Sequence, residues 1–310
     1  MPAPKNLLLL SDLMLLAVAV VWGSSYGIVK SALVFYPVLG LLTLRFGITF
    51  VVLSPTLGGL RRTDAATLRG VLGTGVLLLG IFLCETFGVL LTRASNAAFL
   101  ISLCVVLTPL AEWLLLKRRP SRIEWAAVAL SLLGAWLLAG HGELGFNLGD
   151  GLILAAAVLR ALMVCATKRL VRGRSMPALT MTAVQSGVVA VGSAAVALAL
   201  VPAQWQPLPP FSGHAAFWGC VLWLVAACTL FAFFAQNYAI RRSSPTRVAL
   251  LMGSEPAFGA LFASLWLAES ISATAWIGGG LIVAASLLAT VRWGKPAAPE
   301  TPEIPQGSQA

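Results

Sequence analysis

The sequence predicts an all-α integral membrane protein with ten transmembrane helices, arranged as two inverted five-helix repeats around a central cavity. Three observations predict this fold. Hydrophobic residues make up 59% of the 310 residues and charged residues only 10%, whereas charged residues are about 25% of a soluble domain. The apolar residues form long runs, and basic residues cluster in every second gap between the runs. Finally, the two halves of the chain resemble each other.

Charge clusters and Pro or Gly turns divide the chain into ten apolar segments, and a span needs about 20 such residues. The segments cover residues 12–31, 36–54, 69–91, 95–116, 123–139, 150–170, 178–201, 214–239, 245–268 and 272–291. The first segment is too long for a cleavable signal peptide core and leads into further spans, so we expect it to stay as the first helix. The polar, Pro-rich tail over residues 294–310 is expected to be disordered and cytoplasmic.

Lys and Arg residues indicate the orientation of the chain. Most of the 21 basic residues fall in the loops on the side of the N-terminus, such as residues 61–69, 117–122, 168–174 and 241–247. Cytoplasmic loops carry this excess, so both termini are expected in the cytoplasm. A net charge of +10 could suggest a nucleic acid partner, but its confinement to short loops between spans favours a membrane protein with no such partner.

The repeat is visible where residues 95–138 align with residues 246–289, with Ser121 on Ser272 and Trp125 on Trp276. The alignment predicts a first repeat over residues 1–140 and a second over residues 148–293. Five helices per repeat, an odd number, force the second copy to enter the membrane upside down.

Inversion predicts opposite charge in equivalent loops. The turn at residues 117–122 is strongly basic, whereas its counterpart at residues 268–273 carries only Glu269. Inverted repeats are typical of secondary transporters, whose substrate site lies near the midplane between the two copies.

Ionisable groups inside the spans are the first candidates for a site, because each costs about 2.5 to 3.5 kcal/mol there and tends to face a cavity or another charge. They are Arg45, Glu85, Arg160 and Glu255. The repeat alignment adds polar neighbours at equivalent depths, namely Gln185, Gln236, Asn237 and Tyr238. Two positive and two negative groups suit a zwitterion such as an amino acid. Alternatively, the arginines pair with the glutamates and only lock helices together.

Two further features point to the same pathway. Glu255 lies near midspan beside Pro256, where a broken helix would expose backbone carbonyls to a cavity. Pro109 occupies a similar place in the first repeat, one turn further along, so both prolines are expected to break helices and to take part in gating. The first helix brings an aromatic face and hydroxyls to midspan through Trp22, Ser24, Ser25 and Tyr26; packing against lipid or helices is the alternative for the tryptophan. Glu112-Trp113, near a cytoplasmic end, is expected to be an interface anchor.

Other classes of function find little support. The five cysteines lie inside apolar runs without a CxxC pair, so they predict neither a disulfide frame nor a metal site. The sequence contains no HExxH, paired aspartate or GxSxG motif with a histidine in reach. We therefore expect no enzyme and no cofactor; an intramembrane enzyme is the competing class, and a channel lacks a visible filter loop.

Trp22 to Tyr26 resembles the W-G-S-x-F/Y signature of the drug/metabolite transporter superfamily, EamA type. Glu255-Pro256, Leu267-Ala268-Glu269, Trp276 and Gly278 are similar to its C-terminal motif. The resemblance covers residues 12–291. It implies a monomeric transporter of the bacterial inner membrane that moves a small metabolite through the lipid bilayer by alternating access.

The same resemblance implies export of amino acids and related compounds, and aromatic amino acid exporters of the YddG type are one comparison. Transport of a nucleotide-sugar or a drug within this superfamily is the alternative. Coupling to protons, with Glu255 as the carrier, and simple facilitated transport both stay open.

Overall fold

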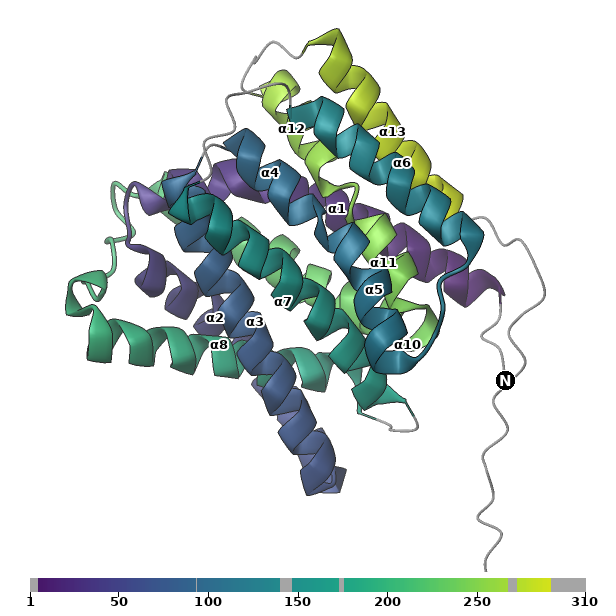
Figure 1. The fold of residues 1–310 in the computed structure, drawn as a ribbon. Coiled ribbons are helices and arrows are strands. Elements are labelled where there is room, and N and C mark those ends of the chain that lie inside the picture. The colour runs from purple at the N-terminus through teal and green to yellow at the C-terminus, as the bar shows by residue number, and fades with distance from the viewer. Residues whose placement is uncertain (1–4, 93, 140–146, 173–175, 267–271, 291–310) are drawn as a thin grey trace, which may run out of the picture.

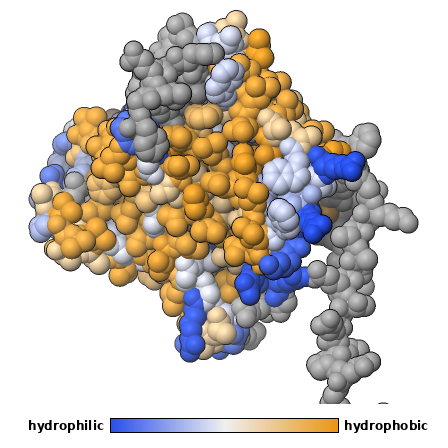
Figure 2. All heavy atoms as spheres, in the orientation of Figure 1, coloured by the Kyte–Doolittle hydropathy of each residue, from blue (hydrophilic) through white to orange (hydrophobic). Residues whose placement is uncertain are grey.

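The computed structural model describes residues 5–92, 94–139, 147–172, 176–266 and 272–290, except for a few side chains (Figure 1). These residues are nearly all helical and include no strand, which confirms the all-α prediction. Seven of their helices are long and apolar enough to cross a membrane, and a shorter apolar helix covers Ala273–Leu288. The face in Figure 2 is largely apolar, as a lipid-facing surface must be. The predicted tail, Arg93 and Glu269 lie outside the described residues.

The first half of the chain contains six α-helices and a 3-10 helix. They are α1 (Lys5–Leu33), α2 (Val38–Leu53), the 3-10 helix Ser54–Arg62, α3 (Ala65–Leu91), α4 (Ala94–Ser102), α5 (Cys104–Leu116) and α6 (Arg122–Ala139). The predicted segment over residues 95–116 is thus interrupted at Leu103. Pro109 was expected to break this helix, but it lies inside α5.

The second half follows a similar order. Its elements are α7 (Leu148–Val171), α8 (Ala178–Leu200), a short 3-10 turn Pro202–Gln204, α9 (Ala215–Val225), a π-helical turn Ala226–Phe231, α10 (Ala232–Arg242), α11 (Pro245–Met252), α12 (Glu255–Trp266) and α13 (Ala273–Thr290). The predicted segment over residues 245–268 is interrupted at Gly253 and Ser254, directly before Glu255 and Pro256. Each predicted apolar segment coincides with one helix or with helices in series, while the count of ten membrane crossings stays a prediction.

Local sequence explains several helix ends. Asp64 caps α3 by accepting a hydrogen bond from the backbone N–H of Thr67 at 2.9 Å. Asn147 and Asp150 form a reciprocal capping box at the start of α7. Ser244 caps α11, whose first residue is Pro245, a position where the missing N–H of proline costs no helical bond.

Small residues let particular helices approach closely, which positions the interior. The helices α6 and α13 pack side by side (Figure 1); a Cβ added at Gly134 would lie 2.6 Å from the carbonyl oxygen of Gly278. The helices α1 and α12 meet in the same way, and a Cβ at Gly23 would lie 2.9 Å from the carbonyl oxygen of Glu255. Glycine therefore brings the start of α12, with Glu255, against Trp22 and its neighbours on α1.

Candidate functional site

A cavity lies between α1, α2, α3, α7, α9, α10 and α12, with about 800 Å³ of empty space that includes open space at its edge. Its wall contains many of the residues predicted from the sequence: Trp22, Ser25, Arg45, Glu85, Arg160, Gln236 and Glu255. The other lining residues are mostly apolar or aromatic. The structure therefore brings the four predicted intramembrane charges to one space.

Arg160 on α7 lies between the two glutamates of the cavity. Its Nη2 is 3.0 Å from Glu85 Oε2 on α3, and its Nη1 is 3.1 Å from Glu255 Oε2 at the start of α12. The guanidinium also lies 5.2 Å from the ring centroid of Trp22. This geometry is compatible with both interpretations of the intramembrane charges, helix locking and ligand binding. Arg160 joins helices through ion pairs, and the same groups line a cavity.

Arg45 on α2 is held by the π-helical turn. Its Nε donates to Thr229 Oγ1 at 2.6 Å, and its Nη2 donates to the carbonyl oxygen of Cys228 at 3.1 Å. The indole N–H of Trp22 donates to the same carbonyl at 3.0 Å. Phe82 lies beside the guanidinium, with the ring centroid at 5.1 Å. A π-helical turn often marks a functional site, and here it orients two residues of the cavity wall.

Three predicted polar residues lie away from the cavity wall. Asn237 Nδ2 donates to Thr182 Oγ1 at 3.0 Å and to Gln185 Oε1 at 3.1 Å. Gln185 Nε2 in turn donates to Thr74 Oγ1 at 3.0 Å. These bonds join α3, α8 and α10. The aromatic ring of Tyr238 lies against Arg242, with 3.6 Å between the guanidinium carbon and the ring centroid.

The remaining predicted residues are placed as follows. Ser24 is buried and accepts a hydrogen bond from the indole N–H of Trp223 at 3.2 Å, while Ser25 donates to the carbonyl oxygen of Trp22 at 2.7 Å. Tyr26 is part of α1, and its side chain lies outside the described residues. Pro256 lies at the second position of α12.

A second, smaller cavity lies between the two helix interruptions. Its wall includes Ser102, Cys104 and Thr108 near the α4–α5 interruption and Met252, Gly253 and Pro256 near the α11–α12 interruption. The interruptions also touch, because a Cβ added at Gly253 would lie 2.3 Å from Val105 Cγ2. This contact explains the glycine at position 253, because a side chain there would collide with Val105. Arg160 and Glu255 line both cavities, so their ion pair lies between them.

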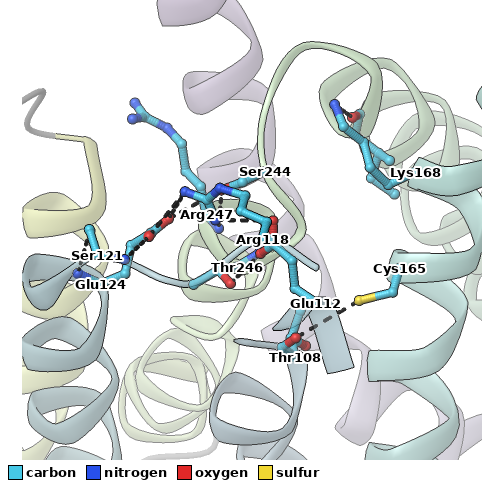
Figure 3. Close-up of polar contacts among 11 residues, drawn as sticks. Thr108, Glu112, Arg118, Ser121, Glu124, Cys165, Lys168, Ser244, Thr246 and Arg247 are labelled. Atoms are coloured by element: carbon cyan, nitrogen blue, oxygen red, sulfur yellow. Dashed lines mark hydrogen bonds and ion pairs between the residues drawn. The ribbon is translucent and has the colours of Figure 1, made fainter. Parts of the chain in front are cut away.

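A polar network joins α5, α6 and α11 (Figure 3). Glu112 on α5 is only 1% exposed. It accepts hydrogen bonds from Arg118 Nη1 at 3.0 Å, from the backbone N–H of Thr246 at 3.0 Å and from Thr246 Oγ1 at 2.5 Å. The expectation that Glu112 anchors the protein at the lipid interface is therefore wrong, because its carboxylate caps α11 inside the protein.

The same network extends to α6 and α1. Arg118 Nη2 lies 2.8 Å from Glu124 Oε1 at the start of α6, and Ser244 Oγ donates to the same oxygen at 3.3 Å. Arg247 pairs with Asp12 on α1, with Nε 3.1 Å from Oδ1. Burial alone would lower the pKa of Arg118, but the carboxylates of Glu112 and Glu124 hold it above its usual value.

Sequence reasoning missed this network, although two signals pointed to it. Ser121 followed by Glu124 is a capping-box pattern, and both of its bonds are present: the Ser121 N–H donates to Glu124 Oε2 at 2.7 Å, and the Glu124 N–H donates to Ser121 Oγ at 3.2 Å. Ser244 before Pro245 is a helix start. Among the described residues, no group of three or more His, Cys, Asp or Glu side chains is placed to hold a metal ion.

Comparison with known proteins places this geometry in a family. The model of the EamA-like transporter family matches residues 9–140 and again residues 147–291. The chain is 28% identical to an uncharacterized transporter of Archaeoglobus fulgidus, over 92% of this chain and 87% of the relative. It is 27% identical to the uncharacterized inner membrane transporter YedA of Escherichia coli K12, over 89% of each chain.

Two further similarities complete the comparison. A protein of Streptantibioticus cattleyicolor named as a probable terminal-alkyne amino-acid exporter is 25% identical over 88% of this chain and 91% of its own length. A solved crystal structure shares the fold, with a TM-score of 0.72 at 21% identity, over 90% of this chain and 96% of that one. The double match of the family model covers nearly the whole chain and confirms the resemblance seen in the sequence: this multi-pass membrane protein belongs to the EamA-like transporter family.

Proposed function

We propose that this protein exports a small zwitterionic metabolite, an amino acid or a close relative of one, across the bacterial inner membrane. The charge-balanced cavity carries the proposal, because two arginines and two glutamates face one space inside an apolar bundle. Such charges are costly in a membrane and are rarely kept without a functional role. A ligand with one positive and one negative group leaves the net charge of the cavity unchanged. The amino-acid exporter among the relatives supports both the substrate class and the direction.

The atoms available to a ligand are specific. Arg45 uses Nε and Nη2 to hold the π-helical turn, and Glu85 uses Oε2 to pair with Arg160. Within the described part of the chain, Arg45 Nη1 and Glu85 Oε1 make no hydrogen bond. A carboxylate would bind Arg45 through Nη1, and an ammonium group would bind Glu85 through Oε1. Trp22, Phe82 and Phe233 supply an aromatic wall for the rest of the ligand, with 6.0 Å between the ring centroids of Phe82 and Phe233.

Helix packing supports two inverted repeats of five membrane-spanning helices. Exchanging the repeats would exchange α1 with α7, α3 with α9 and α10, and α4 and α5 with α11 and α12. The observed neighbours obey this exchange: α1 packs on α10 and α12, while α7 packs on α3, α4 and α5. The self-equivalent pairs α2 with α8 and α6 with α13 also pack together. A pseudo-two-fold axis relates inverted repeats in this way, and the two matches of the family model support the division near residue 140.

Two barriers, the Arg160–Glu255 ion pair and the network around Glu112, support transport by alternating access. With both termini cytoplasmic, Val29, Leu41 and Val89 of the large cavity lie toward the periplasmic ends of their helices, so the cavity faces outward. The Arg160–Glu255 ion pair then separates it from the small cavity on the cytoplasmic side. Beyond the small cavity, Glu112 and its partners close the cytoplasmic end. Export requires these contacts to open while the outer helix ends close around the empty cavity.

Counterflow in liposomes tests the proposal. Purified protein is reconstituted with unlabelled amino acid inside, and uptake of a labelled panel of amino acids is measured. We expect uptake of at least one amino acid by the wild type and a loss of tenfold or more in Arg45→Lys, because a lysine cannot keep the forked contacts to the π-helical turn. The matched control is Arg69→Lys on α3, an exposed position. Transport of a nucleotide-sugar, with no flux of any amino acid, would reject the proposal in favour of another substrate class.

A further inference from the structure

We propose that Gln236 selects the substrate, favouring amino acids whose apolar side chain ends in an uncharged hydrogen-bonding group, a hydroxyl or a carboxamide. This inference rests on the proposed function, since it assigns part of the substrate to a residue of the same cavity. It is carried by the hydrogen bonding of the Gln236 side chain and by its position on α10.

The carboxamide of Gln236 is buried without a partner. The residue is 1% exposed and lines the large cavity. Among the described residues, neither Oε1 nor Nε2 of Gln236 has a hydrogen-bond partner. Buried polar side-chain atoms are nearly always paired, and a donor or acceptor left unpaired is unfavourable. A carboxamide with both ends unused, in the wall of a cavity, is therefore positioned to bind something that enters the cavity.

The adjacent residue shows that this is not a general feature of polar residues in the bundle. Asn237 carries the same functional group one position later, and its amide donates to both Thr182 and Gln185. Gln185 donates to Thr74 as well. Hydrogen bonds between helices thus account for the burial of Asn237 and Gln185. The Gln236 carboxamide makes no such bond, so its burial needs another explanation.

The position of Gln236 indicates which part of the ligand it meets. Phe233 and Gln236 are three residues apart, hence on one face of α10, and both line the cavity. Thr229, which holds Arg45, precedes Gln236 by two helical turns, or about 10 Å along the axis. The wall therefore presents a guanidinium, then aromatic rings, then a carboxamide. A ligand whose carboxylate binds Arg45 places its side chain along the rings and its tip toward Gln236.

The chemistry of a carboxamide limits which groups at the end of the ligand's side chain, its tip, can bind to Gln236. It offers an N–H donor and a carbonyl acceptor side by side. A hydroxyl or a second carboxamide can both accept and donate, whereas a methyl or phenyl tip leaves Gln236 unpaired. A site built around a hydrogen bond rejects analogues that lack the partner. A charged tip would disturb the balance of the two arginines and two glutamates, so uncharged polar tips fit best.

The test uses matched pairs of amino acids that differ at the tip. Counterflow of labelled substrate in liposomes is inhibited with tyrosine against phenylalanine, and with glutamine against norleucine. We expect the wild type to favour the polar member of at least one pair by roughly tenfold or more, and Gln236→Met, which is close in size and apolar, to reduce that ratio to about twofold or less. Melting temperature in detergent without ligand is the second readout. Gln236→Met should melt at or above the wild-type temperature, because it removes an unpaired polar group.

Asn237→Met is the matched control for stability, because it breaks two bonds between helices and should melt below the wild type. Four results overturn the proposal. Equal ratios in the wild type and in Gln236→Met remove the selective role. A fall in melting temperature for Gln236→Met shows that the carboxamide has a structural partner. Transport of amino acids without any preference overturns the assignment of Gln236 alone, whereas absence of all amino-acid flux overturns the proposed function with it.

Discussion

Glu112→Gln should loosen the closure that we propose for the cytoplasmic end of the bundle. The carboxylate is buried and accepts three hydrogen bonds, two from Thr246 and one from Arg118. Glutamine keeps the size but removes the charge, and its NH₂ group cannot accept. Hydrogen bonds to a charged group contribute about 1.5 to 3 kcal/mol. We take this range for the whole change, because the Arg118 side chain is 42% exposed and keeps its pair with Glu124. It corresponds to a shift of roughly 10- to 150-fold toward the open state.

Thiol labelling measures this shift directly. Cys104 lines the small cavity behind the closure, so in a chain that keeps Cys104 as its only cysteine, a water-soluble maleimide reaches it from the cytoplasmic side only when the network opens. We expect the labelling rate of Cys104 in inside-out vesicles to rise about tenfold or more in Glu112→Gln. Arg119→Gln is the control, since Arg119 lies in the same basic loop and is exposed. An unchanged labelling rate in a folded Glu112→Gln protein would refute the role of this network as a closure.

Three further predictions concern the cavity and the packing around it. Glu255→Gln should lower amino-acid flux by about tenfold or more, measured with and without a pH gradient, because it leaves the partly buried Arg160 with one partner fewer. Normal flux under both conditions would show that Glu255 is neither proton carrier nor ligand. Thr229→Val removes the acceptor for the Nε of Arg45 and should cost about 1 kcal/mol of substrate affinity, seen as a several-fold rise in the half-saturation concentration with little change in melting temperature. Gly134→Ala places a methyl group 2.6 Å from a backbone carbonyl of α13 and should destabilise the protein by about 1 to 3 kcal/mol. The new methyl of Gly280→Ala meets no atom within 4 Å beyond the adjacent backbone of its own helix, so this variant should leave the melting temperature unchanged.

Helix content and membrane character follow from composition alone. Long runs of apolar residues have no other stable form in a bilayer than a helix, because every backbone N–H and C=O must be paired within the segment. Charged side chains are also costly in the apolar core of a bilayer, so a short list of charged residues inside those runs suffices to propose a site. Arg45, Glu85, Arg160 and Glu255 are all in the cavity wall.

Helix interruptions are less accessible to sequence reasoning. Proline indicated the break before α12 correctly, since Pro256 is the second residue of the helix that follows it. Proline also indicated a break at Pro109, yet α5 continues through this residue and the chain is interrupted at Leu103. The reason lies in contacts between distant segments: Val105 packs against Gly253, so the two interruptions meet. A local rule for proline contains no information about such a contact.

The sequence by itself determined the membrane-embedded helical class, the family and the intramembrane charges, because these depend on which residues are present and in what order. Only the tertiary structure decided which polar side chains share a space. Gln236 and Asn237 are adjacent and equally polar, but consecutive residues of a helix point about 100° apart, so one lines the cavity and the other bonds to α8. In helices that are apolar on nearly every face, hydropathy does not distinguish the faces. The direction of each side chain, and with it the membership of the site, is therefore set by the neighbouring helices.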